Sequence, residues 1–223
     1  MTSLRSSKSK PIIGEISIPG DKSISHRALM LGSVSIGKTK ISGLLESDDV
    51  LATANALGQM GINVIKNNKD FWEVDGRGVG GLKKPKNILD LGNSGTAARL
   101  LIGLVGSHQF DSMITGDQSL ISRPMERIIT PLSQMGMNFI SAKNKLPLNV
   151  RGPSTLIPIK YKLPVPSAQV KSAILLAGLN APGQTIIIEP EPTRNHTEIM
   201  FKEFGADIST KVLKNGVRQI TLI

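Results

Sequence analysis

Cysteine is absent from this chain of 223 residues, and aromatic side chains make up only 3% of it. The lack of cysteine excludes disulfide bonds, thiolate metal sites and a cysteine nucleophile. The scarcity of aromatic residues argues against modules that stack nucleic-acid bases on aromatic side chains. Any catalysis must therefore depend on lysine, arginine, histidine, carboxylates or backbone dipoles.

Long apolar runs are also absent. The longest uncharged apolar run, residues 172–188, is broken near its middle by Pro182 and Gly183, so it does not predict a membrane-spanning helix. The apolar core of a secretory signal peptide is missing as well. We therefore expect a soluble, cytoplasmic protein that makes no membrane contact.

Basic side chains exceed acidic ones, with 27 Lys and Arg against 17 Asp and Glu, and the formal net charge is +10. This excess favours an anionic ligand without distinguishing nucleic acid, an acidic membrane surface and small phosphorylated molecules. The cations are scattered singly, whereas nucleic-acid binding favours a stripe of them. One cluster, Arg5, Lys8 and Lys10, lies in a serine-rich stretch, and we expect residues 1–10 to form a mobile basic tail.

A unit of helix, strand, helix and short strands occurs three times along the chain. Its first helix begins near Asp21, Asn93 and Ser167. Its second helix is predicted over 48–61, 123–136 and 196–205. Each second helix ends at a glycine, as expected where the following residue takes a positive φ. The sequence therefore predicts an α/β fold of three similar units about a pseudo-threefold axis, with residues 11–20 as a strand outside the repeats.

The first helix of each unit opens with small polar or basic residues: Lys22-Ser23, Asn93 to Thr96, and Ser167 to Gln169. A helix start offers free N–H groups and about half a positive charge, so it can hold an anion. Serine and asparagine are also ordinary N-caps, which is the simpler explanation for any one helix. If the axis brings the three starts together near Arg27 and Arg123, the sequence predicts one anion-binding face.

Three other patterns have a structural interpretation. Gly76–Gly81 matches GxGxxG, but two lysines and a proline at 83–85 follow where a dinucleotide site needs a helix, so we expect a turn. Asp48 and Asp49 could act as an acid–base pair, but they stand at a helix start, where acidic residues cap. The histidines have no metal-ligand spacing and are interpreted as surface or capping residues: His26, His108 and His196.

Five stretches of the sequence resemble the 5-enolpyruvylshikimate-3-phosphate (EPSP) synthase family. They are PGDKSISHR (19–27), LGNSGTAAR (91–99), RPM (123–125), SAQVKSA (167–173) and EPEPTRNHTE (189–198). The resemblance covers nearly the whole chain, and Ala168 in place of a second serine resembles the bacterial class II subgroup. It implies transfer of the enolpyruvyl group of phosphoenolpyruvate to the 5-hydroxyl of shikimate 3-phosphate, by addition and elimination, with release of phosphate.

The resemblance also implies a fold and a set of domains. The enolpyruvyl transferase fold has two domains, each an inside-out α/β barrel of three βαβαββ repeats about a pseudo-threefold axis. By this comparison residues 21–223 form one three-repeat substrate-binding domain. Residues 11–20 are a strand of the partner domain, which is otherwise missing. Because the acid–base carboxylates of the family lie in that missing half, we expect this chain alone to be inactive.

Site residues follow from the resemblance residue by residue. The expected contacts to shikimate 3-phosphate are Lys22, Ser23, Arg27, Ser167, Ala168, Gln169 and Arg194. The expected contacts to phosphoenolpyruvate are Lys22, Asn93, Gly95, Arg123 and Gln169. Lys22 is the one catalytic candidate. Both substrates carry a phosphate and a carboxylate, which basic side chains and helix starts bind through charge-assisted hydrogen bonds.

The remaining expectations concern ligands and alternatives. We expect no cofactor, no metal and no nucleic acid, and a monomer when the protein is complete. One alternative is the sister enzyme that transfers enolpyruvyl to UDP-N-acetylglucosamine, although that family usually carries a loop cysteine that this chain lacks. Another is a non-catalytic anion-binding module built from half of an active site.

Overall fold

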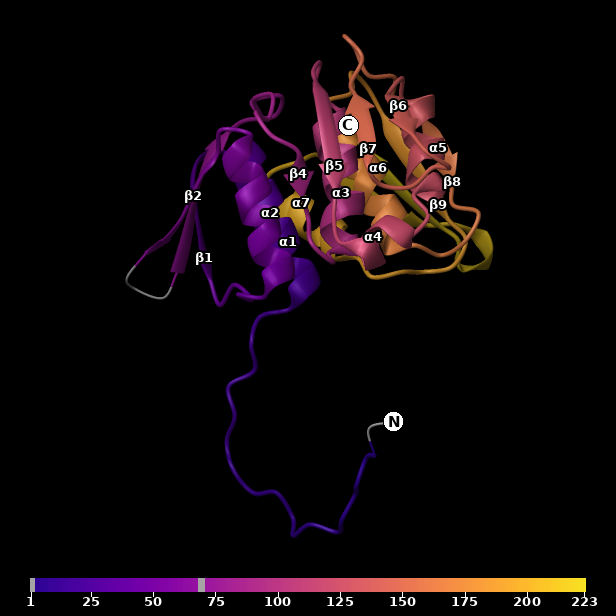
Figure 1. Cartoon of the computed structure of the whole chain (residues 1–223). Helices are drawn as coiled ribbons and strands as arrows, with labels where there is room; N and C mark the ends of the chain where they lie inside the picture. Colours follow the sequence, from indigo (N-terminus) through magenta and orange to yellow (C-terminus); the bar gives the residue numbers. More distant parts are fainter. Residues whose placement is uncertain (1–2, 68–70) are drawn as a thin grey trace.

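The computed structural model describes residues 3–67 and 71–223, and its helices and strands lie between Lys22 and Leu222. Three consecutive units pack side by side, and residues 3–20 leave the folded body as one extended segment (Figure 1). Among the described residues, no helix is long and apolar enough to cross a membrane.

The first unit consists of two helices and a three-stranded sheet. Its elements are α1 (Lys22–Val34), β1 (Ile36–Ser42), α2 (Asp48–Gln59), β2 (Asn63–Asn67) and β3 (Phe71–Arg77). The strand order is β1-β3-β2, and both pairs are antiparallel. The GxGxxG stretch follows β3 as a turn closed by the Gly81 N–H to the Gly78 carbonyl, as predicted.

The second and third units share one four-stranded topology. The second contains β4 (Leu89–Asp90), α3 (Gly95–Gly106), β5 (Asp111–Thr115), α4 (Gln118–Ser122), α5 (Glu126–Gln134), β6 (Asn138–Ser141) and β7 (Leu148–Arg151). The third contains β8 (Lys160–Lys162), α6 (Ala168–Gly178), β9 (Thr185–Glu189), α7 (His196–Glu203), β10 (Ile208–Val212), a 3₁₀ turn (Lys214–Gly216) and β11 (Arg218–Leu222). The strand orders are β4-β5-β7-β6 and β8-β9-β11-β10, each with one parallel pair at its start.

The repeat is therefore confirmed, with one difference between the units. β5 and β9 each have a parallel neighbour, whereas β1 pairs only with β3 among the described residues. The second helices end as predicted, because Gly61, Gly136 and Gly205 all take φ between 85° and 93°. That conformation suits glycine, which has no Cβ to clash.

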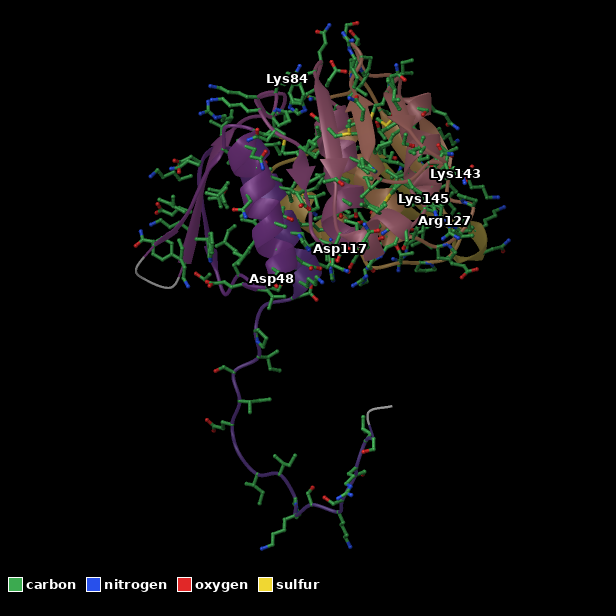
Figure 2. All side chains as sticks on the ribbon, viewed as in Figure 1. Asp48, Lys84, Asp117, Arg127, Lys143 and Lys145 are labelled. Carbon is green, nitrogen blue, oxygen red and sulfur yellow. The ribbon has the colours of Figure 1, made fainter. Side chains whose placement is uncertain are left out.

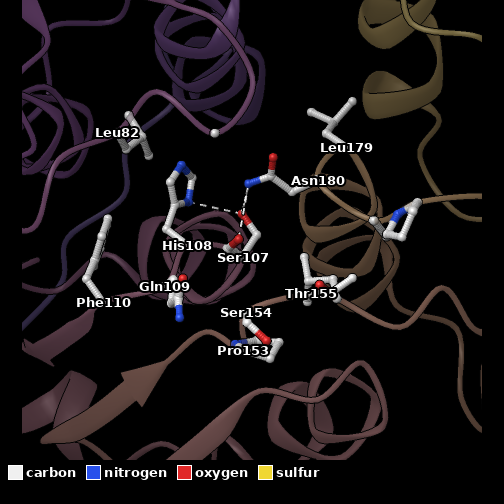
Figure 3. A pocket seen from close by; sticks show the side chains of 14 residues that line it. Leu82, Ser107, His108, Gln109, Phe110, Pro153, Ser154, Thr155, Leu179 and Asn180 are labelled. Atoms are coloured by element: carbon white, nitrogen blue, oxygen red, sulfur yellow. Dashed lines mark hydrogen bonds between the residues drawn. The ribbon is translucent and has the colours of Figure 1, made fainter.

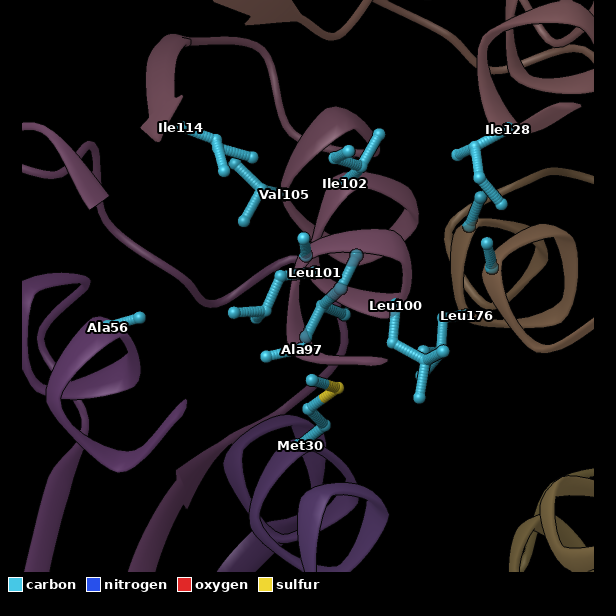
Figure 4. Close-up of a cluster of buried hydrophobic side chains, with 14 of the residues drawn as sticks. Met30, Ala56, Ala97, Leu100, Leu101, Ile102, Val105, Ile114, Ile128 and Leu176 are labelled. Atoms are coloured by element: carbon cyan, nitrogen blue, oxygen red, sulfur yellow. The ribbon is translucent and has the colours of Figure 1, made fainter. Parts of the chain in front are cut away.

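The core forms around the first helix of each unit. α3 lies between α1, α2 and the α5–α6 pair, and its Leu100, Leu101 and Val105 are completely buried (Figure 4). α3 and α6 approach so closely that a Cβ on Gly103 would overlap the backbone carbonyl of Ala173. The continuous apolar surface of α3 is explained by this central position, since a helix covered on all sides has no solvent face.

The strand predicted over 11–20 is not formed. Its isoleucines are 82–97% exposed, and within the described ranges no strand pairs with it. A strand requires hydrogen-bond partners for its N–H and C=O groups. The described residues offer none to this segment, so its pairing within a partner domain stays a prediction.

The single helix predicted over 123–136 is also wrong in detail. α4 ends at Ser122, Arg123 is extended (φ −77°, ψ 137°), and α5 begins only at Glu126. Pro124 explains the break, because the residue before a proline is disfavoured in the helical region. Arg123 therefore lies in a short connection between two helices.

Candidate active site

The starts of α1, α3 and α6 converge, as the repeat predicted. Each pair of these helices is joined by a side-chain contact within the first turns. The contacts are His26 Nε2 with Ser94 Oγ (3.4 Å), Gln169 Nε2 with Thr96 Oγ1 (3.1 Å) and Arg27 Nη2 with Ser172 Oγ (2.6 Å). The caps Asp21, Ser94 and Ser167 each accept a backbone N–H of their own helix. One face of the molecule therefore presents three helix N-termini.

Arg27 is buried at the centre of this face, 4% exposed. Its Nη1 donates to the carbonyl and the hydroxyl of Ser23, and its Nε donates to Thr197 Oγ1 at 2.7 Å. Burial, and to a smaller extent the charge of Arg194, lower the pKa of Arg27 to about 10 against the opposing effect of Glu198. Arg27 thus ties α1 to α6 and α7 and remains cationic at neutral pH.

The start of α3 carries a second group of cations. Arg123 donates from Nη2 to Asn93 Oδ1 at 2.6 Å, and Arg99 donates from Nη1 to the Gly95 carbonyl at 3.2 Å. Burial lowers the pKa of Arg99, and the nearby charge of Arg123 adds to this effect. Two like charges beside a helix N-terminus make this region strongly attractive to an anion.

Gly95 is buried between those two arginines. A Cβ at this position would lie 2.7 Å from Arg123 Nη1 and 2.9 Å from Arg99 Nη1. Glycine is therefore the residue that lets both guanidinium groups approach the α3 backbone. Such close approach of side chains or ligand to the main chain is a common reason for glycine at a helix start.

Lys22 extends from the first turn of α1 and forms an ion pair with Asp49 in the first turn of α2. Its side chain is about half exposed, so it can reach a bound molecule. Asp48 and Asp49 occupy the first turn of α2, and Asp117 caps α4. In Figure 2, Asp48 and Asp117 lie at the end of the molecule from which residues 3–20 depart, whereas Lys84 lies at the opposite end.

The remaining predicted site residues lie around the same face. Ser167, Ala168 and Gln169 are half-buried at the start of α6. Arg194 is exposed in the loop before α7, close enough to Arg27 for its charge to lower the pKa of that guanidinium. The structure thus brings the predicted residues into two neighbouring cationic groups, one at α3 and one between α1, α6 and α7.

Sequence reasoning missed the histidine at the centre. His26 is completely buried, not a surface or capping residue. Its Nδ1 lies 2.7 Å from Thr53 Oγ1, and Thr53 donates its proton to the Asp49 carbonyl. Nδ1–H therefore donates to Thr53 and Nε2 accepts from Ser94. Burial is the main cause that lowers the pKa of His26 to about 4.

Five polar residues behind the face were also missed: Lys171, Ser172, Glu189, Thr197 and Glu198. All are at most 8% exposed. One feature of the sequence could have indicated them: Lys171 is the single charged residue in the otherwise mostly apolar sequence of α6. A lysine is rarely buried without an acidic partner, so it predicted carboxylates nearby without indicating which.

A large hollow lies elsewhere. It has a volume of about 570 Å³ and is lined by residues that follow α3 and α6, together with Gly80 and Leu82 after β3 and residues 153–156 after β7 (Figure 3). Asn180 closes one side by donating to the carbonyl and the hydroxyl of Ser107. His108 is buried there rather than on the surface, and it caps the end of α3 with its Nδ1 3.0 Å from the Leu104 carbonyl, which agrees with the capping interpretation. Burial lowers its pKa. No predicted site residue lines this hollow.

The topology and the basic face together define one domain of the enolpyruvyl transferase fold. The family model for EPSP synthase (3-phosphoshikimate 1-carboxyvinyltransferase) matches residues 6–219. The chain therefore belongs to the EPSP synthase family.

Individual relatives agree with this assignment. The 3-phosphoshikimate 1-carboxyvinyltransferase of Paramagnetospirillum magneticum is 52% identical over 99% of this chain and 50% of its own length. That of Zymomonas mobilis is 54% identical over 98% of this chain and 48% of its own length. A solved EPSP synthase from Acinetobacter baumannii superposes with a TM-score of 0.87 and 45% identity, over 94% of this chain and 46% of that one. The chain spans about half the length of the relatives it matches.

Proposed function

We propose that this chain provides half of an EPSP synthase active site and that residues 21–223 are its substrate-binding domain. Two pairs of cations meet at converging helix starts, Arg99 with Arg123 and Arg27 with Arg194. The two guanidinium groups of each pair repel each other unless an anion lies between them. This pairing carries the proposal, because shikimate 3-phosphate and phosphoenolpyruvate each bring a phosphate and a carboxylate.

The geometry supports separate places for the two substrates. Shikimate 3-phosphate fits the group formed by Ser23, Arg27, Arg194 and the 167–169 turn. Phosphoenolpyruvate fits the α3 start, where Gly95 lets the guanidinium groups of Arg123 and Arg99 approach the backbone. Gln169 donates to Thr96 across the boundary between α6 and α3, so it stands where it can contact both molecules.

The reaction that this arrangement serves has two steps. The 5-hydroxyl of shikimate 3-phosphate gives up its proton to a base as its oxygen bonds to C2 of phosphoenolpyruvate, and C3 gains a proton as the C2–C3 double bond becomes single, which gives a tetrahedral intermediate. Loss of that C3 proton and of phosphate then gives EPSP. In this proposal Lys22, in the first turn of α1, contacts phosphoenolpyruvate, and its ammonium group stabilises negative charge that develops on the transferred group.

Other properties of the complete enzyme are part of the same proposal. A cytoplasmic location, expected from the sequence, is one of them. The resemblance supports a monomer that needs no cofactor, and residues 11–20 as a strand of the second domain. The exposed isoleucines of 11–20 agree with a segment whose packing partner lies outside this chain.

Titration calorimetry with shikimate 3-phosphate tests the binding half of the proposal. Arg27→Ala should weaken binding by about 1.5–3 kcal/mol, because it removes a charge-assisted contact and releases Ser23. The exposed Arg151 is a matched control, and Arg151→Ala should bind like the parent chain. Equal affinity of the parent and Arg27→Ala contradicts the assignment, as does tighter binding of UDP-N-acetylglucosamine than of shikimate 3-phosphate.

A further inference from the structure

A buried ionic cluster lies behind the proposed shikimate 3-phosphate place. Lys171 on α6 is 1% exposed, and its Nζ lies 3.0 Å from Glu189 Oε1 and 2.7 Å from Glu198 Oε1. Burying charges is costly unless they are paired and hydrogen-bonded. Apolar side chains in place of this cluster would stabilise the fold as well. Stability alone therefore does not explain why the charges are buried here.

Each carboxylate of the cluster holds a different segment. Glu189 ends β9, and its Oε1 accepts the backbone N–H of Thr193 at 3.1 Å and also the Thr193 hydroxyl. It thereby fixes the loop that carries Arg194. Glu198 lies in the first turn of α7, so its ion pair with Lys171 fixes the start of α7 against α6.

The residues next to this ion pair contact Arg27. Ser172 follows Lys171, and Thr197 precedes Glu198. Their hydroxyl oxygens lie 2.6 Å apart, and both accept hydrogen bonds from the Arg27 guanidinium. The Lys171–Glu198 pair and the Ser172–Thr197 pair therefore form two adjacent bridges between α6 and α7. The Ser172–Thr197 pair also binds the Arg27 guanidinium.

We propose that Lys171 is a positioning residue, which acts through Glu198 and Glu189 to hold Thr197 and the Arg194 loop in the geometry that orients Arg27. Lys171 does not touch the substrate in this proposal. The identity of the ligand rests on the proposed function, whereas the orientation of Arg27 does not.

Two substitutions of Glu198 separate the effect of its contact with Lys171 from the effect of its negative charge. Glu198→Ala removes the bridge to α7 but leaves Lys171 paired with Glu189, so the chain is expected to fold. Glu198→Gln removes the same charge but keeps an oxygen that accepts from Lys171. Lys171→Met removes the cation itself, and Lys202→Met on the exposed side of α7 is the matched control.

Two measurements are made on each variant. One is the affinity for shikimate 3-phosphate by calorimetry. The other is the ¹⁵N NMR signal of Arg27 Nε, which is assigned by its loss in Arg27→Lys. Glu198→Ala should bind about 10-fold more weakly and shift the Nε signal. Glu198→Gln and Lys202→Met should stay within about 3-fold of the parent and retain the signal.

Two results would contradict the proposal. If Glu198→Ala binds shikimate 3-phosphate like the parent and its Arg27 Nε signal is unshifted, the proposal is wrong. If Glu198→Gln weakens binding as much as Glu198→Ala, charge rather than positioning is responsible, and the proposal is also wrong. If the parent chain does not bind shikimate 3-phosphate, the proposed function fails, and the Nε signal still decides whether the cluster orients Arg27. Should Lys171→Met not fold, the two Glu198 variants carry the test.

Discussion

Gly95 shows how a single missing side chain shapes the proposed phosphoenolpyruvate place. In Gly95→Ala the new Cβ would crowd Arg123 Nη1 and Arg99 Nη1, so both flexible guanidinium groups must move away from the α3 start. We expect phosphoenolpyruvate to bind about 1.5–3 kcal/mol more weakly, because one charge-assisted contact is lost. Calorimetry in the presence of shikimate 3-phosphate measures this.

The control for that substitution is Gly58 on α2. A Cβ there meets nothing within 4 Å, so Gly58→Ala should leave binding unchanged. If the Gly95 and Gly58 variants bind phosphoenolpyruvate equally well, Gly95 does not act by making room for the arginines.

His26 makes stability depend on pH. It is neutral in the folded chain with a pKa of about 4, against 6.5 for a free histidine, mainly because it is buried. Between these values the unfolded chain binds the proton and the folded chain does not, so stability is full above about pH 6.5 and falls as the pH drops toward 4. The loss is about 3 kcal/mol.

Urea unfolding of the parent and His26→Gln at pH 7 and pH 4 checks this difference. The glutamine variant should lose about 3 kcal/mol less on acidification than the parent. His108 and Asp117 also have lowered pKa values, but both chains contain them and their contributions cancel. Parallel acid losses in the two chains would show that His26 does not titrate as proposed.

Single residues of the site were only partly predictable. Motif resemblance indicated Arg27, Gly95 and Arg123, and the structure places Arg27 in the second turn of α1, Gly95 at the first residue of α3 and Arg123 in the connection between α4 and α5. It gave no information on His26, whose role depends on Thr53 and Ser94 from two other helices. Contacts between residues far apart in sequence, such as Arg27 with Thr197, arise only from the packing of whole units.

At the scale of elements, the helices were predictable because local chemistry sets their ends. Asp21, Ser94 and Ser167 cap the starts that the sequence indicated, and a glycine follows each second helix. The failure was at Pro124, whose effect on Arg123 was overlooked, whereas the strand at 11–20 stays a prediction about a partner domain. A strand depends on a neighbour, and a pattern within one segment cannot supply that neighbour.

The extended segment can be removed as a test of this view. A variant lacking residues 1–18 should keep its free energy of unfolding within about 0.5 kcal/mol, because the isoleucines of the segment are exposed. A variant lacking residues 218–223 loses β11, which lies between β9 and β10, and should unfold. A marked loss of stability in the first variant means that 11–18 packs onto the domain in solution.

At the scale of the whole molecule, the basic face is open to one side. Expulsion of water strengthens electrostatic contacts in an active site, and this chain has only one wall of the proposed site. A phosphate-release assay with both substrates should therefore give turnover near background for the 223-residue chain. Activity should appear when the half of a relative that this chain does not cover, expressed separately, is added. Robust phosphate release by the chain alone would falsify the two-wall interpretation.

The unpaired edge of β1 has a further consequence, for how the protein behaves in concentrated solution. An open strand edge offers a row of N–H and C=O groups to any other strand, including the same edge of a second molecule. β1 carries Lys40 and also Lys38, whose charge is partly offset by Glu73 and Asp75, each 3.8 Å away. Lysines along an edge oppose such pairing by mutual repulsion. Salt weakens that repulsion, because at physiological ionic strength exposed charges more than about 8 Å apart are largely screened from each other. Low-salt buffers should therefore keep preparations of this chain free of aggregates, and high salt should promote them.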